Sequence, residues 1–136
     1  MANRWLVKTE PSVYSYQQLV KEKRTVWDGV KNNLALKHMK GVKKGDWVMI
    51  YHTGKEKAAV GIARAVSGAH PDPKKNDARF LVFDVEAVKP LPRPVTLAEL
   101  KGVPKLASFD LLRLSRLSVM PVSDDQWKII VAMGDK

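Results

Sequence analysis

Short apolar blocks recur along the chain, and their length and spacing favour β-strands joined by brief polar turns. The first block, residues 4–9, ends at Glu10 and Pro11, because proline has no amide hydrogen with which to extend a strand ladder. Gly61 lies inside another block and predicts a bulge or a close approach to the backbone. Strands are predicted over residues 4–9, 47–52, 58–66, 79–91 and 116–122, with a fragment at 26–27.

Polar capping residues between these strands introduce four short helices. Asn32 or Asn33 can cap a helix that runs through about Lys40 and ends at Gly41. At the other three helix starts, a serine or threonine is followed three residues later by Glu or Gln, the pattern of a capping box. These pairs are Ser15 with Gln18, Thr96 with Glu99, and Ser123 with Gln126.

The order of these elements predicts an α+β protein with a curved or closed sheet, since strands are joined by tight hairpins and separated by short helices. Residues 70–77, which include two prolines, are expected to form a loop. The chain has 136 residues, the length of one domain, so a single domain over residues 1–136 is expected. Trp5, Trp47 and Trp127 are expected in the core.

The charge balance adds a candidate partner to this globular pattern. Lysine and arginine number 24 against 14 aspartates and glutamates, a formal net charge of +10, which is typical of nucleic-acid binders. A solvated surface usually explains an isolated charge run, but here the excess surrounds a polar aromatic segment, which favours contact with a polyanion. The clustered residues are Lys21, Lys23, Arg24, Lys31, Lys37, Lys40, Lys43 and Lys44.

Several chemistries are excluded by what the sequence lacks. There is no cysteine, which rules out disulfides, thiolate metal sites and cysteine nucleophiles. The three histidines have no metal-ligand spacing, and phosphate-binding glycine motifs and the nucleophile elbow are absent, so neither a metal nor a cofactor is expected. There is no signal-peptide pattern and no apolar run long enough for a membrane helix, so a soluble cytoplasmic protein is expected.

Trp27 lies in a segment, VWDGVKNN at 26–33, that suits neither a plain core strand nor a plain turn. Its ring can form a pocket wall while the neighbouring amides offer paired donors and acceptors. Aromatic rings stack nucleobases with about 1–3 kcal/mol each, and asparagine matches a base edge. The combination predicts a site for a base flipped out of its stack. Tyr51 and His52 are candidates for the opposite wall, and Tyr51 fits a core position equally well.

Successive blocks of the chain resemble the EVE domain family. They are WLVKTEP at 5–11, WDGVKN at 27–32, IYH at 50–52, VGIA at 60–63 and RLSVMPV at 116–122, and they follow the family's order over nearly the whole chain. The resemblance implies a PUA-like pseudo-barrel of mostly antiparallel strands with peripheral helices, in the superfamily that also contains YTH and ASCH domains. It further implies binding of a modified base in DNA or RNA.

The resemblance also implies roles for individual residues. Trp27 would be the stacking wall, and Thr9 would line the pocket where family members more often carry serine, its extra methyl group narrowing the space. Residues chosen for their chemistry and for the resemblance together form two sets. The base-pocket candidates are Thr9, Glu10, Trp27, Asn32, Asn33, Tyr51 and His52, and the phosphate-contacting candidates are Lys8, Lys31, Lys37, Arg113 and Arg116.

Three hypotheses for function follow, and the first is preferred: a non-enzymatic reader that takes a modified base into a pocket walled by Trp27. The second is an ASCH-like amidohydrolase or nuclease that uses Lys8, Thr9 and Glu10. Strand alternation places Thr9 on the opposite face from its two neighbours, and the ASCH signature G-x-K-x-x-E-x-R is missing, which both count against the enzyme. The third is a basic module that binds nucleic acid or protein through charge alone, without a pocket.

Overall fold

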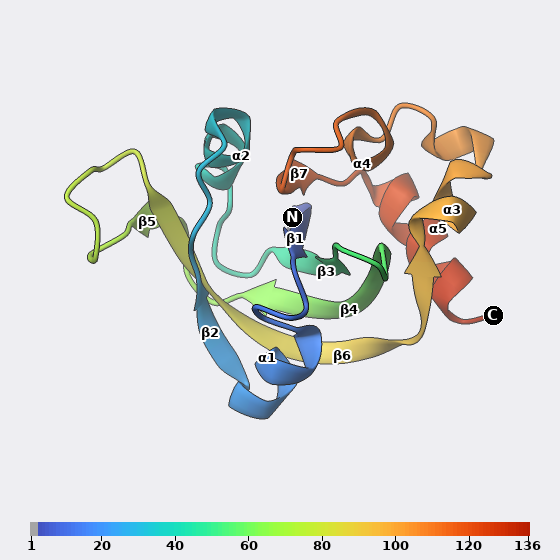
Figure 1. The fold of residues 1–136 in the computed structure, drawn as a ribbon, viewed down its shortest axis with the longest axis horizontal. Helices are drawn as coiled ribbons and strands as arrows, with labels where there is room; N and C mark the ends of the chain where they lie inside the picture. The colour runs from blue at the N-terminus through green and yellow to red at the C-terminus, as the bar shows by residue number, and fades with distance from the viewer. Residues whose placement is uncertain (1–2) are drawn as a thin grey trace.

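The computed structural model describes residues 3–136, and its centre is a strongly curved sheet (Figure 1). The strands are β1 (Arg4–Thr9), β2 (Arg24–Trp27), β3 (Trp47–His52), β4 (Ala58–Ala65), β5 (His70–Pro71), β6 (Leu81–Thr96) and β7 (Val119–Pro121). Their order is β2-β6-β4-β3-β1-β7, with β5 paired to β6. Strands β1 and β3 run parallel, and the other pairs are antiparallel. The predicted α+β pseudo-barrel of mostly antiparallel strands is therefore confirmed.

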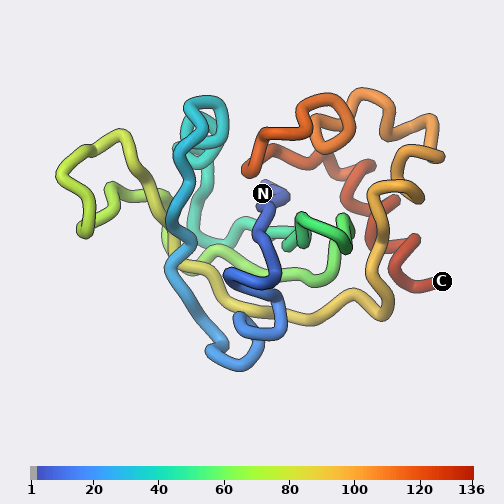
Figure 2. The backbone as a smooth tube through the Cα atoms, viewed as in Figure 1, coloured from blue at the N-terminus to red at the C-terminus, as the bar shows by residue number. Residues whose placement is uncertain are grey.

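Short helices surround this sheet. They are α1 (Tyr16–Glu22), α2 (Asn33–Met39), α3 (Leu97–Lys101), α4 (Asp110–Arg113) and α5 (Asp124–Gly134), with a 3₁₀ turn η1 (Pro104–Leu106). Complete capping boxes start α3 and α5, as predicted. At α1 the Ser15 side chain accepts from the Gln18 amide, but the Gln18 side chain donates to Glu22, so only half of the predicted box forms. Figure 2 shows α5 on the side of the molecule opposite the loop that joins β5 to β6.

Strand β6 extends beyond its predicted end at residue 91. Gly61 of β4 pairs with Pro90, whereas Ala59 pairs with Val95, so residues 91–94 bulge out of the ladder. Prolines are tolerated in a strand at such irregularities, because no ladder hydrogen bond is required there. The sequence prediction stopped the strand at its prolines and missed the continuation. Strand β5 was not predicted either: it lies within the expected loop at 70–77 and pairs with β6.

Gly61 allows helix α1 to approach the sheet closely, which confirms the inference drawn from its position. A Cβ at Gly61 would lie 2.3 Å from the Tyr16 ring, too close for any other residue type without rearrangement. The Tyr16 hydroxyl donates to the Ile62 carbonyl at 2.7 Å. Burial raises the pKa of Tyr16 to about 12, so this hydroxyl keeps its proton at neutral pH. The start of α1, and with it the turn that precedes it, is therefore fixed against β4.

The four tryptophans do not divide between core and surface as predicted. Trp5 and Trp127 are buried as expected. Trp47 is only half-buried and packs against the core, with the Arg64 guanidinium 5.2 Å from its ring centroid, so its core assignment is confirmed only in part. Trp27 was separated from the core on sequence grounds, yet it is only 7% exposed and packs in the hydrophobic cluster. Its position in the core does not prevent it from forming a pocket wall as well.

Candidate functional site

A hollow of about 530 Å³, here called the Trp27 pocket, opens where the ends of β1 and β2 lie near each other. This volume falls within the range of about 300–1,000 Å³ that is typical of small-molecule sites. Gly29 has φ +77°, a left-handed conformation suited to glycine, and turns the chain after β2. The lining residues are Lys8, Thr9, Glu10, Val13, Tyr14, Thr25, Val26, Trp27, Asp28, Gly29, Val30, Lys31 and Ser118.

Two aromatic rings meet at this pocket. The centroids of Tyr14 and Trp27 are 6.2 Å apart and the ring planes are nearly perpendicular, at 87°. The Tyr14 hydroxyl donates to Glu22 at 2.6 Å, and burial together with this hydrogen bond raises the pKa of Tyr14. Tyr14 was not among the residues predicted from the sequence. The available signal was its place directly before the Ser15 cap, on the segment that joins β1 to α1.

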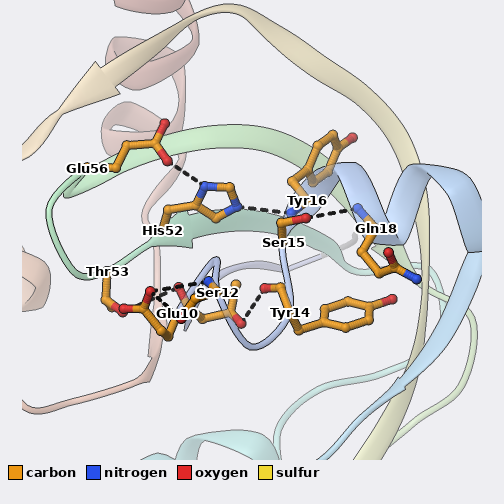
Figure 3. A network of polar contacts seen from close by, with 10 residues as sticks. Glu10, Ser12, Tyr14, Ser15, Tyr16, Gln18, His52, Thr53 and Glu56 are labelled. Atoms are coloured by element: carbon orange, nitrogen blue, oxygen red, sulfur yellow. Dashed lines mark hydrogen bonds and ion pairs between the residues drawn. The ribbon is translucent and has the colours of Figure 1, made fainter.

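Thr9 and Glu10 bring polar groups to the same pocket. The Thr9 hydroxyl donates to the Tyr14 carbonyl at 2.7 Å, which leaves its oxygen lone pairs as acceptors. One Glu10 carboxylate oxygen accepts from the amide and hydroxyl of Ser12, at 3.2 and 3.1 Å, and the other from the Thr53 hydroxyl at 3.4 Å (Figure 3). These donors are uncharged, so they orient the Glu10 carboxylate without neutralising it.

Lys8 and Lys31 supply positive charge to the pocket. The Lys8 ammonium group donates to the Ser115 carbonyl at 2.9 Å and lies 5.8 Å from the centroid of the Tyr51 ring. Burial lowers the pKa of Lys8, because a charged amine loses hydration there. Lys31 also lines the pocket, from the loop after β2. The pocket therefore combines apolar walls, two carboxylates (Glu10 and Asp28) and two amines.

His52 does not line the Trp27 pocket, contrary to the prediction that it forms the opposite wall, and Tyr51 takes the core position, one of its two predicted alternatives. Tyr51 is 3% exposed and His52 is 2% exposed. The His52 Nε2 accepts from the Tyr16 amide at 2.9 Å, and Nδ1 lies 2.7 Å from Glu56 Oε1 (Figure 3). Since an N–H donates to Nε2, the proton of the neutral ring is on Nδ1 and is donated to Glu56. His52 thus lies behind the pocket and holds the start of α1.

The remaining predicted residues lie outside the pocket. The Asn32 side chain caps α2 by accepting from the Ala35 amide at 3.0 Å, so its oxygen is already used by the helix. Asn33 and Lys37 are exposed on α2 and belong to the lining of neither hollow. A second hollow of about 330 Å³ is lined by Asn32, Leu34, Arg113, Leu114, Ser115, Arg116 and Leu117. Residues adjacent in sequence line the two hollows: Lys31 and Ser118 line the Trp27 pocket, and their neighbours Asn32 and Leu117 line the second hollow.

Within the described part of the chain, no group of three or more His, Asp or Glu side chains is arranged to hold a metal ion. Among the helices of residues 3–136, none has the length and apolar character required to cross a membrane.

A curled, mostly antiparallel sheet with peripheral helices and a pocket between strand ends defines a PUA-like pseudo-barrel. The family model of the EVE domain matches residues 3–133, and the chain belongs to the EVE domain family. The resemblance inferred from the sequence blocks is therefore confirmed.

Solved structures agree with this assignment. The NMR structure of a Rhodopseudomonas palustris protein is 43% identical, covers 98% of this chain and 93% of its own, and gives a TM-score of 0.92. The crystal structure of the human THYN1 protein in complex with 5-methylcytosine-containing DNA is 26% identical, with 99% of each chain covered and a TM-score of 0.89. An ASCH protein from Zymomonas mobilis shares the fold at 14% identity, with 96% of this chain and 95% of its own covered and a TM-score of 0.66.

Proposed function

We propose that this chain is a non-enzymatic reader that binds DNA carrying a modified base and takes that base into the Trp27 pocket. One observation carries the proposal: a hollow of nucleobase scale is walled by two perpendicular aromatic rings, in an EVE domain with a human relative that was crystallised with 5-methylcytosine-containing DNA. Nucleic acid carrying a modified base is accordingly the proposed partner.

Stacking and charge together offset the cost of flipping. Removing a base from a duplex costs a few kcal/mol, and stacking on one aromatic ring returns about 1–3 kcal/mol. Lys8 and Lys31 lie at the pocket, and Arg113 and Arg116 lie at the adjoining hollow. Contacts from these side chains to phosphates supply the rest through counterion release. Lys37 remains a proposed phosphate contact on the exposed face of α2.

The lining chemistry favours a methylated cytosine among the modified bases. A carboxylate accepts a hydrogen bond from the exocyclic amine of cytosine, and Glu10 and Asp28 both line the pocket. A methyl group on the ring is stabilised by apolar neighbours, which Val26 and Val30 provide. A base with a carbonyl oxygen in place of the amine would face the same carboxylates unfavourably.

The test compares Trp27→Leu with Trp47→Leu on matched duplexes, one plain and one carrying a single 5-methylcytosine, at two salt concentrations. Trp27→Leu should lose roughly ten- to hundredfold of the preference for the modified duplex, while weak salt-dependent binding persists. Trp47→Leu, which removes a half-buried ring outside the pocket, should keep the preference. Circular dichroism establishes that both variants are folded. An intact preference in folded Trp27→Leu would contradict the proposal.

The enzyme hypothesis has one feature in its favour, because Lys8, Thr9 and Glu10 all line the Trp27 pocket. Their hydrogen bonds support the reader instead. The Thr9 hydroxyl donates to the Tyr14 carbonyl and the Lys8 amine to the Ser115 carbonyl, whereas an attacking hydroxyl needs a neighbouring base to take its proton. Turnover of acylated nucleosides that is lost in Thr9→Ala would establish the enzyme, and the reader predicts no turnover by either protein.

A further inference from the structure

Val13 is an exposed apolar side chain at the mouth of the Trp27 pocket. Its exposed fraction is 81%, the highest among the large hydrophobic residues of the described chain that face solvent: Val13, Val20, Val26, Leu34 and Val88. Of these, Val13 and Val26 line the Trp27 pocket. A valine that projects into water gains free energy when a partner covers it, so its place beside the pocket requires an explanation.

The turn that carries Val13 is held firmly by hydrogen bonds from the backbone and from side chains. The amides of Val13 and Tyr14 both donate to the Glu10 carbonyl at 2.9 Å. The Glu10 carboxylate accepts from Ser12 (Figure 3), and the Thr9 hydroxyl donates to the Tyr14 carbonyl. Because these bonds span the turn on both sides of Val13, the valine cannot fold inward to bury itself without breaking them.

The far end of the turn is fixed to the interior. The Tyr16 amide donates to the buried Nε2 of His52 at 2.9 Å, and the Tyr16 hydroxyl donates to the Ile62 carbonyl. The turn is thus clamped between β1 and the start of α1, with Val13 at its tip. Because of these hydrogen bonds, the turn can keep its conformation when Val13 contacts a partner.

Two amines and two carboxylates line the pocket beside this tip, and the positive charge of the whole chain restricts the kind of partner. Lys8 and Lys31 line the same pocket, and the chain as a whole carries a net charge of +10. An apolar side chain on a basic surface suits a partner that presents apolar faces between phosphates. The stacked bases of a nucleic-acid duplex have that arrangement, and proteins insert apolar wedges between base steps.

We propose that Val13 is a wedge that enters the base stack of a duplex and fills the space left by the flipped base. This inference rests on the proposed function and goes beyond it, because it makes duplex DNA the target and gives the Glu10–Tyr14 turn a separate task. The pocket binds the base that leaves the stack, and Val13 prevents its return.

The experiment measures the dissociation constants of Val13→Ser, Val13→Ile and Val20→Ser for a duplex with one 5-methylcytosine and for the same strand alone. Val13→Ser should weaken duplex binding about tenfold and leave single-strand binding within about twofold, because a single strand has no gap to fill. Val13→Ile, which keeps a branched apolar side chain, should bind the duplex as tightly as the unaltered chain does. Val20→Ser, which changes an exposed valine on α1 outside the pocket, should alter neither constant.

If Val13→Ser weakens binding equally to the duplex and the single strand, Val13 only lines the pocket. If it weakens binding to neither, Val13 does not contact the nucleic acid. Both outcomes overturn the wedge. The proposed function fails in a different way, when the unaltered chain does not distinguish the modified from the plain duplex. A duplex-specific loss in Val13→Ser remains visible in that case, so the two failures are separable.

Discussion

Two carboxylates, Glu10 and Glu99, lie in dense hydrogen-bond networks in different parts of the molecule, and their donors differ in charge. Arg93 donates to both oxygens of Glu99, at 3.0 and 2.7 Å, and Thr96 adds its amide and its hydroxyl at 3.1 and 3.0 Å. The Arg93 guanidinium and the Thr96 groups lower the pKa of Glu99 to about 2. Among residues 3–136, the donors to Glu10 are uncharged: the amide and hydroxyl of Ser12 and the hydroxyl of Thr53.

The difference indicates which network serves the fold and which serves a ligand. The Glu99 network joins the end of β6 to the start of α3, and its charge is compensated within the protein. The Glu10 carboxylate is oriented at the Trp27 pocket with its negative charge uncompensated by those donors, so it remains available to a hydrogen-bond donor on a base. Binding should therefore depend on the Glu10 side of the molecule, and the Glu99 side should contribute to stability alone.

The largest effect is expected from His52, which supports the Glu10–Tyr14 turn from behind. Asparagine is too short to reach the Tyr16 amide but can still donate to Glu56, whereas glutamine carries an oxygen near the position of Nε2. His52→Asn leaves a buried donor without its acceptor, and we expect the free energy of unfolding to fall by about 1–3 kcal/mol. The preference for a modified base should fall at least tenfold, since the Tyr14 wall loses its support.

The matched variant His52→Gln should recover most of both losses, as measured by denaturant unfolding and by binding to plain and modified duplexes. If His52→Asn and His52→Gln bind alike while only stability falls, His52 has a purely structural role, and the assignment of this side of the molecule to binding weakens.

Glu10→Gln tests the charge directly, because the amide keeps the shape and one acceptor of the carboxylate. A hydrogen bond to a charged group contributes about 1.5–3 kcal/mol, so affinity for a base that donates an exocyclic amine should fall about tenfold. Stability should stay within about 0.5 kcal/mol, since the half-buried side chain keeps the acceptor for Ser12 and the Thr53 hydroxyl can donate to the Thr9 carbonyl instead. Isothermal titration with the modified duplex measures the first effect and denaturant unfolding the second. A loss of stability without a loss of affinity would mean that Glu10 serves the fold and not the ligand, contrary to the comparison with Glu99.

The contrast between these regions also separates what the sequence could predict from what it could not. The capping pairs at Thr96 and Ser123 depend on residues three positions apart, so local pattern was sufficient. The continuation of β6 past Pro90 depends on a bulge between the Gly61–Pro90 and Ala59–Val95 pairs, which only the partner strand reveals. The helix α4 was not predicted, and β7 is shorter than the block expected at 116–122.

The residues that line the pocket were likewise predictable from the sequence only in part. The unusual composition around Trp27 pointed to the correct strand end, but Tyr14 joins the lining only because the preceding turn folds back through the Thr9 hydroxyl. Tyr51 and His52 were candidates for the opposite wall because they end an apolar strand, and Tyr51 fitted a core position equally well. In the structure, β3 lies between β1 and β4, and its residues from Val48 to His52 are all buried. Which side of a strand faces a pocket depends on its neighbours, and a single strand's sequence does not record that.

A smaller effect is expected from Glu99→Gln, the counterpart of the Glu10 variant. It removes the charge that pairs with Arg93 and keeps an acceptor for Thr96, so the melting temperature should fall modestly. Affinity for the modified duplex should remain within about twofold of the unaltered chain, because the Glu99 network does not line the Trp27 pocket. Thermal unfolding and the same titration measure the two quantities. A clear loss of affinity would show that the two networks are coupled.

The smallest effect is the pH dependence of that stability difference. The pKa of Glu99 is lowered from 4.5 to about 2 in the folded state, so its charged form stabilises the protein above the unfolded pKa, and the contribution is lost as pH falls from 4.5 towards 2. Glu99→Gln has no such charge to lose. The melting temperatures of the two proteins should therefore differ most above pH 5 and converge as pH falls, which thermal unfolding at successive pH values measures. A difference that stays constant down to pH 2 would mean that Arg93 does not stabilise the carboxylate, and the contrast with Glu10 would then rest on position alone.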